Sequence, residues 1–397
     1  MSIGIAGESG PLQVASAAFE AMVEPQSIEE IAELVRKCEA DQLSLAPLGA
    51  ARTLTQIRRA PVQIGISLRR MARVVAYEPD DMTVVVESGV GLGDLNATLA
   101  KSGQRLPVDP RNPHATTIGA LIAAAHAGPL RLSEGTVRDL LIGIQFVGHG
   151  GRSVRAGGRV VKNVAGYDLM KVMTGSFGTL GIVTEATFKV RPIPENYTLA
   201  VATLDAHDAA FAAALSLHDR IPLIHLEVTS PRVSALLGLE SRFAVLAGFA
   251  GITAELAYQR DRIGSSFEMI EDERARTLYA SLRDVYLDDA IGARLAVLPN
   301  ELARCAHESA TDFVAHVGSG TAELFSSNAD PHPVSRWRVI AHTARGHLRM
   351  LSAPASLRNQ IDFFDRPNPG ALKLMQRLKA SFDPANIFNP GCFVGGL

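Results

Sequence analysis

The chain has 397 residues, more than one hydrophobic core usually serves, so two domains are expected. Apolar residues make up 47% of it, which excludes a disordered chain. Its 39 basic residues nearly balance its 41 acidic ones, and no basic block stands out, so nucleic acid is excluded as the main partner.

Cysteine usage and the first residues narrow the class further. Cys38, Cys305 and Cys392 lie far apart and form no C-x-x-C pair, so we expect no zinc or iron–sulfur site and no disulfide framework. The N-terminus lacks the basic start of a secretory signal, and no apolar stretch reaches the roughly 20 residues of a membrane span. These features predict a cytoplasmic protein, with any attachment to the inner membrane made through partner proteins.

A helix, a strand and a tight loop are predicted first along the chain. Ser27 and Glu30 have the spacing of a capping box, and apolar residues recur at helical spacing over 28–38. The short apolar segment 43–46 predicts a strand that leads into a loop at Gly49.

Strands dominate the next part. The β-branched run 83–87 predicts a strand, and leucines at helical spacing over 92–99 predict the helix that follows. From 140 to 190, short apolar segments alternate with glycine clusters, which is typical of antiparallel strands with tight turns. Residues 182–190 alternate most clearly, and the prolines in 191–194 end that strand.

The texture changes after Pro194. Alanine-rich helical segments such as 209–217 mix with short strands such as 243–247, and the last predicted helix covers 371–380. We therefore place a domain boundary at Pro194.

Four glycine-bearing segments between residues 47 and 183 could cradle a dinucleotide. A pyrophosphate needs several backbone N–H groups at close range, and glycine permits that approach because it lacks a Cβ atom. Each segment alone is equally compatible with an ordinary turn. The segments are Gly49-Ala50-Ala51-Arg52-Thr53, Thr116-Thr117-Ile118-Gly119-Ala120-Leu121, Gly135-Thr136-Val137-Arg138-Asp139 and Gly175-Ser176-Phe177-Gly178-Thr179-Leu180-Gly181.

Two common nucleotide motifs are missing. No G-x-G-x-x-G joins a strand to a helix with an acidic residue about 20 positions on, which disfavours a nicotinamide-type Rossmann site. No G-x-x-x-x-G-K-[ST] occurs, which excludes a P-loop enzyme.

The combination resembles the PCMH-type FAD-binding domain shared by vanillyl-alcohol oxidase and p-cresol methylhydroxylase. The resemblance runs from Pro25 to Pro192, and K-N-V-A-G-Y-D at 162–168 with G-S-x-G-T-L-G-I at 175–182 is its most specific part. This pair is similar to the glycolate oxidase branch, particularly its smaller flavin subunit, and 382–391 resembles the C-terminus of that branch. The resemblance is weak from 195 to 360.

The resemblance implies an α+β fold with a PCMH-type FAD-binding domain of two α/β subdomains over 1–194. A mixed α/β cap over 195–360 and a C-terminal segment, 361–397, that packs back on the FAD domain complete the chain. It also implies a set of FAD contacts. Gly49, Ala50, Ala51, Arg52 and Thr53 hold the pyrophosphate; Thr116, Thr117, Ile118 and Gly119, with Gly135, Arg138 and Asp139, line the same groove; Gly178, Gly181, Ile182 and Val183 meet the adenine and ribose; and Asn163, Ala165 and Gly166 lie near the flavin ring.

Two departures from the family pattern affect this site. The phosphate loop, usually of a triple-glycine type, has methyl groups at Ala50 and Ala51, and Arg52 could supply a charge-assisted contact in exchange. Ala120 replaces the usual second glycine after Gly119. Loose FAD binding, or none, is therefore an open alternative. The segments also lack the histidine and cysteine that tether flavin in some relatives, so we expect non-covalent FAD.

The resemblance implies oxidation of a 2-hydroxy acid such as glycolate, with a larger homologous flavin subunit and an iron–sulfur subunit as partners. Hydride loss from the α-carbon requires a general base and a carboxylate-binding arginine, and the sequence assigns neither. His342 and His347 are the two histidines that might share one site. Their five-residue spacing and the missing nearby carboxylate argue against a metal pair. An independent FAD-linked oxidase and a structural subunit without FAD remain alternatives.

Overall fold

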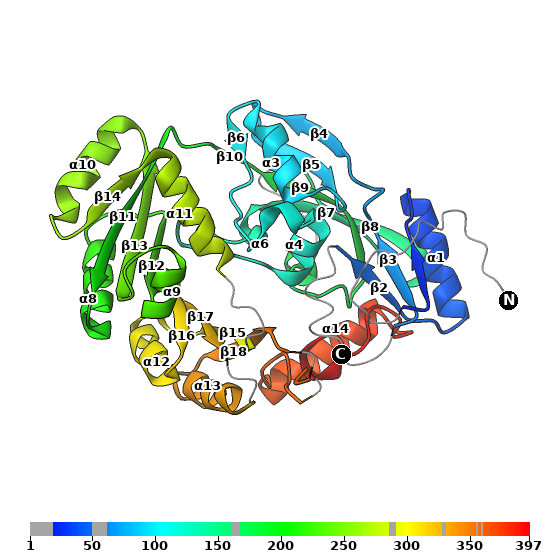
Figure 1. Ribbon diagram of the computed structural model, residues 1–397. Helices are drawn as coiled ribbons and strands as arrows, with labels where there is room; N and C mark the ends of the chain where they lie inside the picture. The colour runs from blue at the N-terminus through cyan, green and yellow to red at the C-terminus, as the bar shows by residue number, and fades with distance from the viewer. Residues whose placement is uncertain are drawn as a thin grey trace. The chain divides into compact units, whose positions relative to one another are not determined.

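The computed structural model describes residues 19–49, 62–159, 167–285, 291–327, 331–354, 356–358 and 360–397. Contacts divide the chain into two units, and each is described by itself (Figure 1). The first unit comprises Met1–His126, Thr136–Pro192 and Arg366–Leu397, and the second comprises Ala127–Gly135 and Ile193–Asp365.

These limits differ from the predicted domains at 127–135 and at 361–365. Ser133 Oγ donates to the Ile224 carbonyl at 3.0 Å, and Arg294 Nη2 donates to the Ala127 carbonyl at 2.9 Å. Both acceptors and donors belong to the second unit, so the excursion 127–135 packs there although it lies between two stretches of the first.

The first unit begins with a small parallel sheet and a helix. β1 (Ala21–Val23), β3 (Ile64–Ser67) and β2 (Leu45–Leu48) pair in that order. α1 (Ile28–Ala40) starts as predicted, because the Ser27 hydroxyl accepts from the Glu30 N–H at 3.2 Å. The Glu30 carboxylate, however, accepts from the Gln26 N–H and not from Ser27.

A five-stranded antiparallel sheet forms the centre of this unit. Its order is β4 (Val74–Glu78), β5 (Thr83–Glu87), β9 (Ile182–Lys189), β7 (Leu141–Gly148) and β8 (Arg152–Gly157). The predicted antiparallel strands between 140 and 190 are therefore confirmed. The helices that share its apolar core are α3 (Leu92–Ala100), α4 (Ile118–Ala124), α6 (Val137–Leu140) and α7 (Leu169–Met173).

Short elements complete the first unit. β6 (Gln104–Arg105) pairs with β10 (Arg191–Pro192). α14 (Pro369–Phe382) carries the chain back to this unit, where Ile387 and Phe388 join the core of α1 and β3.

An eight-stranded antiparallel sheet forms the second unit. Its order is β14 (Glu268–Glu271), β11 (Asn196–Leu204), β13 (Phe243–Gly251), β12 (His225–Thr229), β16 (Asp312–His316), β17 (Thr321–Ser326), β15 (Ile291–Ala296) and β18 (His347–Ser352).

Helices cover both faces of this sheet (Figure 1). α8 (His207–His218), α10 (Thr253–Ile263), α12 (Leu302–Ser309) and α13 (His332–Thr343) pack on one face, in the core that holds Trp337. α9 (Pro231–Leu236) and α11 (Asp272–Asp284) pack on the other, and α5 (Arg131–Glu134) belongs to the excursion. None of the helices in the described ranges has the length and apolar character needed to cross a membrane.

Candidate functional site

Two of the predicted glycine segments meet along α4 in the first unit. At its start, the N–H groups of Ile118 and Gly119 donate to the carbonyls of Val90 and Ser88 at 2.9 and 2.8 Å. Near its end, the Ile122 carbonyl accepts from the Gly175 N–H at 2.9 Å. α4 thus holds the segment 116–119 and the loop 175–181 in one place.

The end of β2 approaches the same place closely. A Cβ atom on Gly49 would lie 2.7 Å from both Ala120 Cβ and Thr117 Oγ1, so only glycine fits there. Gly178 has φ +70, and a Cβ atom on it would lie 2.6 Å from Pro47 Cγ. The backbones of three segments that are distant in the sequence therefore converge where side chains would keep them apart.

The C-terminal segment fastens this convergence. Asn389 Nδ2 donates to the Phe177 carbonyl at 2.7 Å, and the Asn389 N–H donates to the Leu45 carbonyl at 2.7 Å. Lys379 Nζ donates to the Thr179 carbonyl at 2.9 Å and to Asp383 Oδ2 at 2.6 Å. One short stretch of chain therefore holds the loop 175–181 against the end of β2.

Polar atoms left over at this place suit a ligand with many acceptors and donors. Within the described ranges, the Ser88 and Ser176 hydroxyls and the Asn389 Oδ1 atom are buried without a hydrogen-bond partner. Ser88 lies against Gly119, and Ser176 lies in the loop 175–181. The glycine cradle and these atoms fit the pyrophosphate and ribose of a dinucleotide.

The other predicted site residues have varied positions. Ile182 and Val183 begin β9 with buried side chains, which leaves their backbones for contact, as expected. Asp139 accepts from the N–H and hydroxyl of Thr136 at 2.8 Å, so it caps α6. Arg138 lies close enough to Asp168 for its charge, after the hydrogen bond from Lys171, to help lower the pKa of that carboxyl.

Some predicted residues cannot be placed. Ala50, Ala51, Arg52 and Thr53, and likewise Asn163, Ala165 and Gly166, lie outside the described residues. Gly135 is described, but it ends α5 in the second unit. Their contacts with a cofactor stay predictions.

Comparison with known proteins decides the family. A model for the FAD binding domain matches residues 19–157, and one for the C-terminal domain of FAD linked oxidases matches residues 359–392. The chain belongs to the FAD-linked oxidases. Its cofactor is FAD, and its first unit contains the PCMH-type FAD-binding domain.

Several relatives of this FAD-linked oxidase match over most of its length. The D-lactate dehydrogenase [cytochrome] of Arabidopsis thaliana is 29% identical over 94% of the chain and 73% of its own length. The glycolate oxidase subunit GlcE of Escherichia coli is 29% identical over 80% of the chain and 83% of its own. The glycolate oxidase subunit GlcD of Bacillus subtilis is 26% identical over 94% and 88%.

Solved structures support the fold alone. An alkyldihydroxyacetonephosphate synthase superposes with a TM-score of 0.67 at 18% identity, over 93% of this chain and 75% of the other.

The narrow space at Gly49 gives a prediction for FAD affinity. We expect Ala120→Gly to tighten FAD binding about threefold to tenfold, because it removes the methyl group between Gly49 and the start of α4. The same change should lower the free energy of unfolding by roughly 1 kcal/mol, the cost of glycine inside a helix. Fluorescence titration with FAD and thermal melting measure the two effects, and an unchanged or weaker affinity contradicts the crowding argument.

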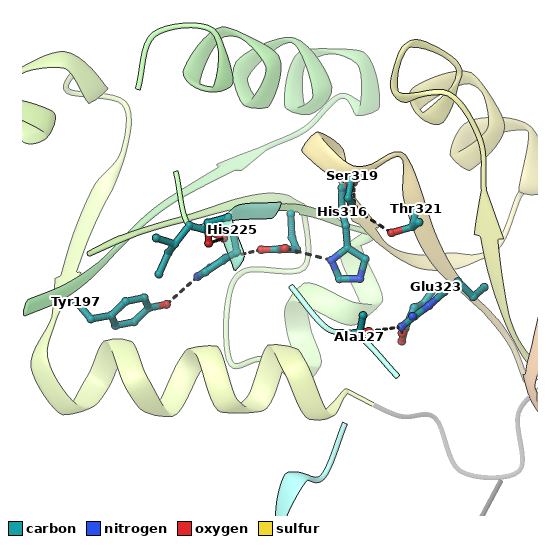
Figure 2. A network of polar contacts seen from close by, with 11 residues as sticks. Ala127, Tyr197, His225, His316, Ser319, Thr321 and Glu323 are labelled. Carbon is teal, nitrogen blue, oxygen red and sulfur yellow. Dashed lines mark hydrogen bonds and ion pairs between the residues drawn. The ribbon is translucent and has the colours of Figure 1, made fainter. Parts of the chain in front are cut away.

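A second group of polar side chains, which sequence reasoning missed, crosses one face of the eight-stranded sheet in the second unit. Figure 2 shows Tyr197, His225 and His316 in line. Tyr197 Oη lies 2.9 Å from His225 Nε2, and Glu227 contacts His225 Nδ1 at 2.6 Å and His316 Nδ1 at 3.1 Å. We call these four residues the polar row.

A cluster of charges continues on the same face. Arg294 pairs with Glu323 at 2.6 Å, and Arg349 lies opposite Arg294 in the β15–β18 register. Burial, together with the charge of Arg294 and against that of Glu323, lowers the pKa of Arg349 to about 10. All three groups are therefore charged at neutral pH, with a sum of +1. We call them the arginine cluster.

The prediction about His342 needs a correction. A carboxylate is near after all, because Asp365 Oδ2 lies 2.8 Å from His342 Nε2 and accepts from the Leu348 N–H at 3.1 Å. Asp365 was overlooked because 23 positions separate it from His342 in the chain. His342 ends in α13 and His347 begins β18, and no three metal-binding side chains gather anywhere in the described ranges.

Other reactive features of the second unit lie apart from the polar row. A cavity of about 470 Å³ is lined by His207, His307 and Asp312 among others, and includes no member of either group. Cys38, Cys305 and Cys392 are all buried, and burial raises the pKa of the Cys38 thiol to about 11, so it is a poor nucleophile.

Proposed function

We propose that this FAD-linked oxidase is the non-covalent FAD-binding subunit of a glycolate oxidase-type 2-hydroxy-acid dehydrogenase. Its partners in that complex are a larger homologous flavin subunit and an iron–sulfur subunit. The observation that carries the proposal is the glycine cradle formed by Gly49, the start of α4 and the loop 175–181. The similarity to GlcE over most of both chains supports the subunit role.

In this proposal, Gly49, Thr116–Gly119 and Gly178–Val183 hold FAD through backbone groups, with Arg52 on the pyrophosphate. FAD supplies the acceptor for the hydride that leaves the α-carbon of the substrate. The chain itself must bind the substrate carboxylate, orient the α-hydroxyl and take up its proton.

The arginine cluster is our candidate for the carboxylate site. Its net charge of +1 in a half-buried place suits one further carboxylate, because guanidinium and carboxylate pair through two parallel hydrogen bonds. Arg294 already holds the Ala127 carbonyl and Glu323, so Arg349 is the better candidate for the ligand.

We expect Arg349→Met to raise the KM for the hydroxy acid at least about tenfold, which is ~1.4 kcal/mol of binding. The FAD content should stay unchanged because Arg349 lies outside the glycine cradle. Steady-state kinetics with Arg336→Met, an exposed arginine of α13, as the control measures the effect. An unchanged KM contradicts the assignment.

The function is tested by the visible spectrum of the purified chain with and without FAD, followed by heat release of the flavin. Anaerobic glycolate or D-lactate is then added to the loaded chain, alone and with its partner subunits. A releasable flavin that these acids bleach supports the proposal, whereas a colourless chain that ignores FAD even with its partners overturns it. Bleaching and turnover by the chain alone favour an independent dehydrogenase, which the match to D-lactate dehydrogenase over 94% of the chain also suggests.

A further inference from the structure

The polar row contains a carboxylate where packing does not require one. Glu227 and His225 are both 0% exposed, and His316 is 8% exposed. Replacing buried ionic groups by apolar ones of similar size is often neutral or stabilising. A fully buried Glu between two histidines is therefore poorly explained by stability alone.

The two imidazoles keep the Glu227 carboxyl ionised. Burial by itself would raise its pKa, but the charge and hydrogen bond of His225, with those of His316, outweigh burial and lower the pKa below its ordinary value. An ionised carboxylate can only accept hydrogen bonds. Each histidine must therefore present a protonated Nδ1 to Glu227.

This arrangement leaves the Nε2 atom of each neutral imidazole as an acceptor. His225 Nε2 faces the Tyr197 hydroxyl at 2.9 Å. His316 is the least buried member of the three, and its Nε2 atom is the open end of the row. The row thus points one proton acceptor out of the sheet and supports it from behind.

His316 also lies beside the arginine cluster. It pairs with Thr321 across the β16–β17 ladder, and Glu323 is the next residue of β17 on the same face, roughly 7 Å along the strand. Figure 2 shows Ala127 and Glu323 near His316. In a 2-hydroxy acid the hydroxyl and the carboxylate are on adjacent carbons, so an acceptor and a cationic cluster at this spacing fit the two groups.

We propose that Glu227, His225 and Tyr197 position His316 to take the proton of the substrate hydroxyl. The inference rests on the proposed function and deepens it. The O–H bond breaks, its proton goes to His316 Nε2 and its electron pair forms the carbonyl, while the α-carbon loses its hydrogen as hydride to FAD. The acid is oxidised by two electrons and FAD is reduced by two, and Glu227 balances the imidazolium charge.

The test variant is Glu227→Gln, which keeps the shape of the side chain. The amide can accept from one imidazole but must donate to the other, which forces that ring into the wrong tautomer. We expect the rate of flavin reduction by the hydroxy acid to fall by about 10²-fold or more, with FAD content and KM near native.

The pH profile gives a readout that a purely structural role would not move. The charged and titratable groups facing Glu227 and His316 on this face are Tyr197, His225, Tyr279, Arg294, Glu323 and Arg349. The reduction rate should rise with pH as the imidazole loses its proton. Loss of the carboxylate charge makes the imidazolium less stable, so the midpoint in Glu227→Gln should move to lower pH.

Thr229→Val is the matched control. Thr229 lies on the same strand and face as Glu227, is 0% exposed, and gives up one buried hydrogen bond to Ser234 at 2.8 Å. It should lose some stability and keep the native rate and midpoint. If Glu227→Gln does not fold, His316→Gln at the open end replaces it and should show the same loss of rate.

Imidazole ¹⁵N NMR of the chain without FAD provides an independent measurement. The native protein should show protonated Nδ1 and unprotonated Nε2 on both His225 and His316, and Glu227→Gln should reverse one of them. A native protein with protonated Nε2 on His316, or a Glu227→Gln variant with native rate and midpoint, overturns the positioning role alone. A loaded native chain that no 2-hydroxy acid reduces overturns the proposed function as well.

Discussion

Gly178→Ala is expected to abolish FAD binding at micromolar cofactor and to lower the free energy of unfolding by roughly 2–5 kcal/mol. Two effects add. An L-residue at φ +70 is strained by about 1–2 kcal/mol. The new methyl group would also lie 2.6 Å from Pro47 Cγ, and the proline ring cannot rotate away. The loop 175–181 must then move off the end of β2, which opens the cradle.

Two glycines separate strain from the clash. Gly103 has φ +67 with nothing within 4 Å of an added Cβ atom, so Gly103→Ala should cost only about 1 kcal/mol and leave FAD bound. Gly158 has open space and no positive φ, so Gly158→Ala should change stability by at most about 0.5 kcal/mol. Denaturant unfolding and FAD titration of the three variants decide the matter. If Gly178→Ala resembles Gly103→Ala, the contact with Pro47 does not shape the site.

Lys379→Met is expected to cost about 3–5 kcal/mol of stability, because it leaves the Asp383 carboxylate buried without its cation. Asp383 is 1% exposed and Lys379 is 7% exposed. Burial lowers the pKa of Lys379 although Asp383 acts to raise it, so the ammonium depends on its three acceptors. The change also frees the carbonyls of Thr179 and Phe388, which Lys379 bridges at 2.9 and 2.8 Å. FAD affinity should therefore fall together with stability.

Urea unfolding with a second substitution tests this account. Lys379→Met combined with Asp383→Asn should recover part of the lost stability, since no charge is then left buried. Lys373→Met, at an exposed position of the same helix, should stay within about 0.5 kcal/mol of native. A single variant as stable as Lys373→Met would falsify the role given to the buried pair.

Local signals in the sequence were sufficient for the elements around the glycine cradle. The capping box at Ser27 predicted a helix over 28–38, and α1 spans Ile28–Ala40. The β-branched run predicted a strand over 83–87, and β5 has those bounds. Such patterns depend on neighbours within a few positions, which the chain itself supplies. The glycines at 49, 119 and 178 could be recognised because a close approach of backbones restricts a position to one residue type.

The polar row had no comparable signal. His225 and Glu227 look like alternate residues of an ordinary strand, and 89 positions separate Glu227 from His316. Asp365 was missed beside His342 for the same reason, and so was the attachment of 127–135 to the second unit. Strand alternation shows that two residues share a face, but it does not show which strand will lie alongside.

The sequence by itself determined the helices and strands of the first unit, the glycine positions and the family of this FAD-linked oxidase. Only the tertiary structure decided that Tyr197, His225, Glu227 and His316 form one row, and that Arg294, Glu323 and Arg349 lie on the same face. The physical reason is register: the pairing of β11, β12, β16, β17, β15 and β18 is set by packing over the whole sheet. A shift of one residue in any pair would turn these side chains to the opposite face.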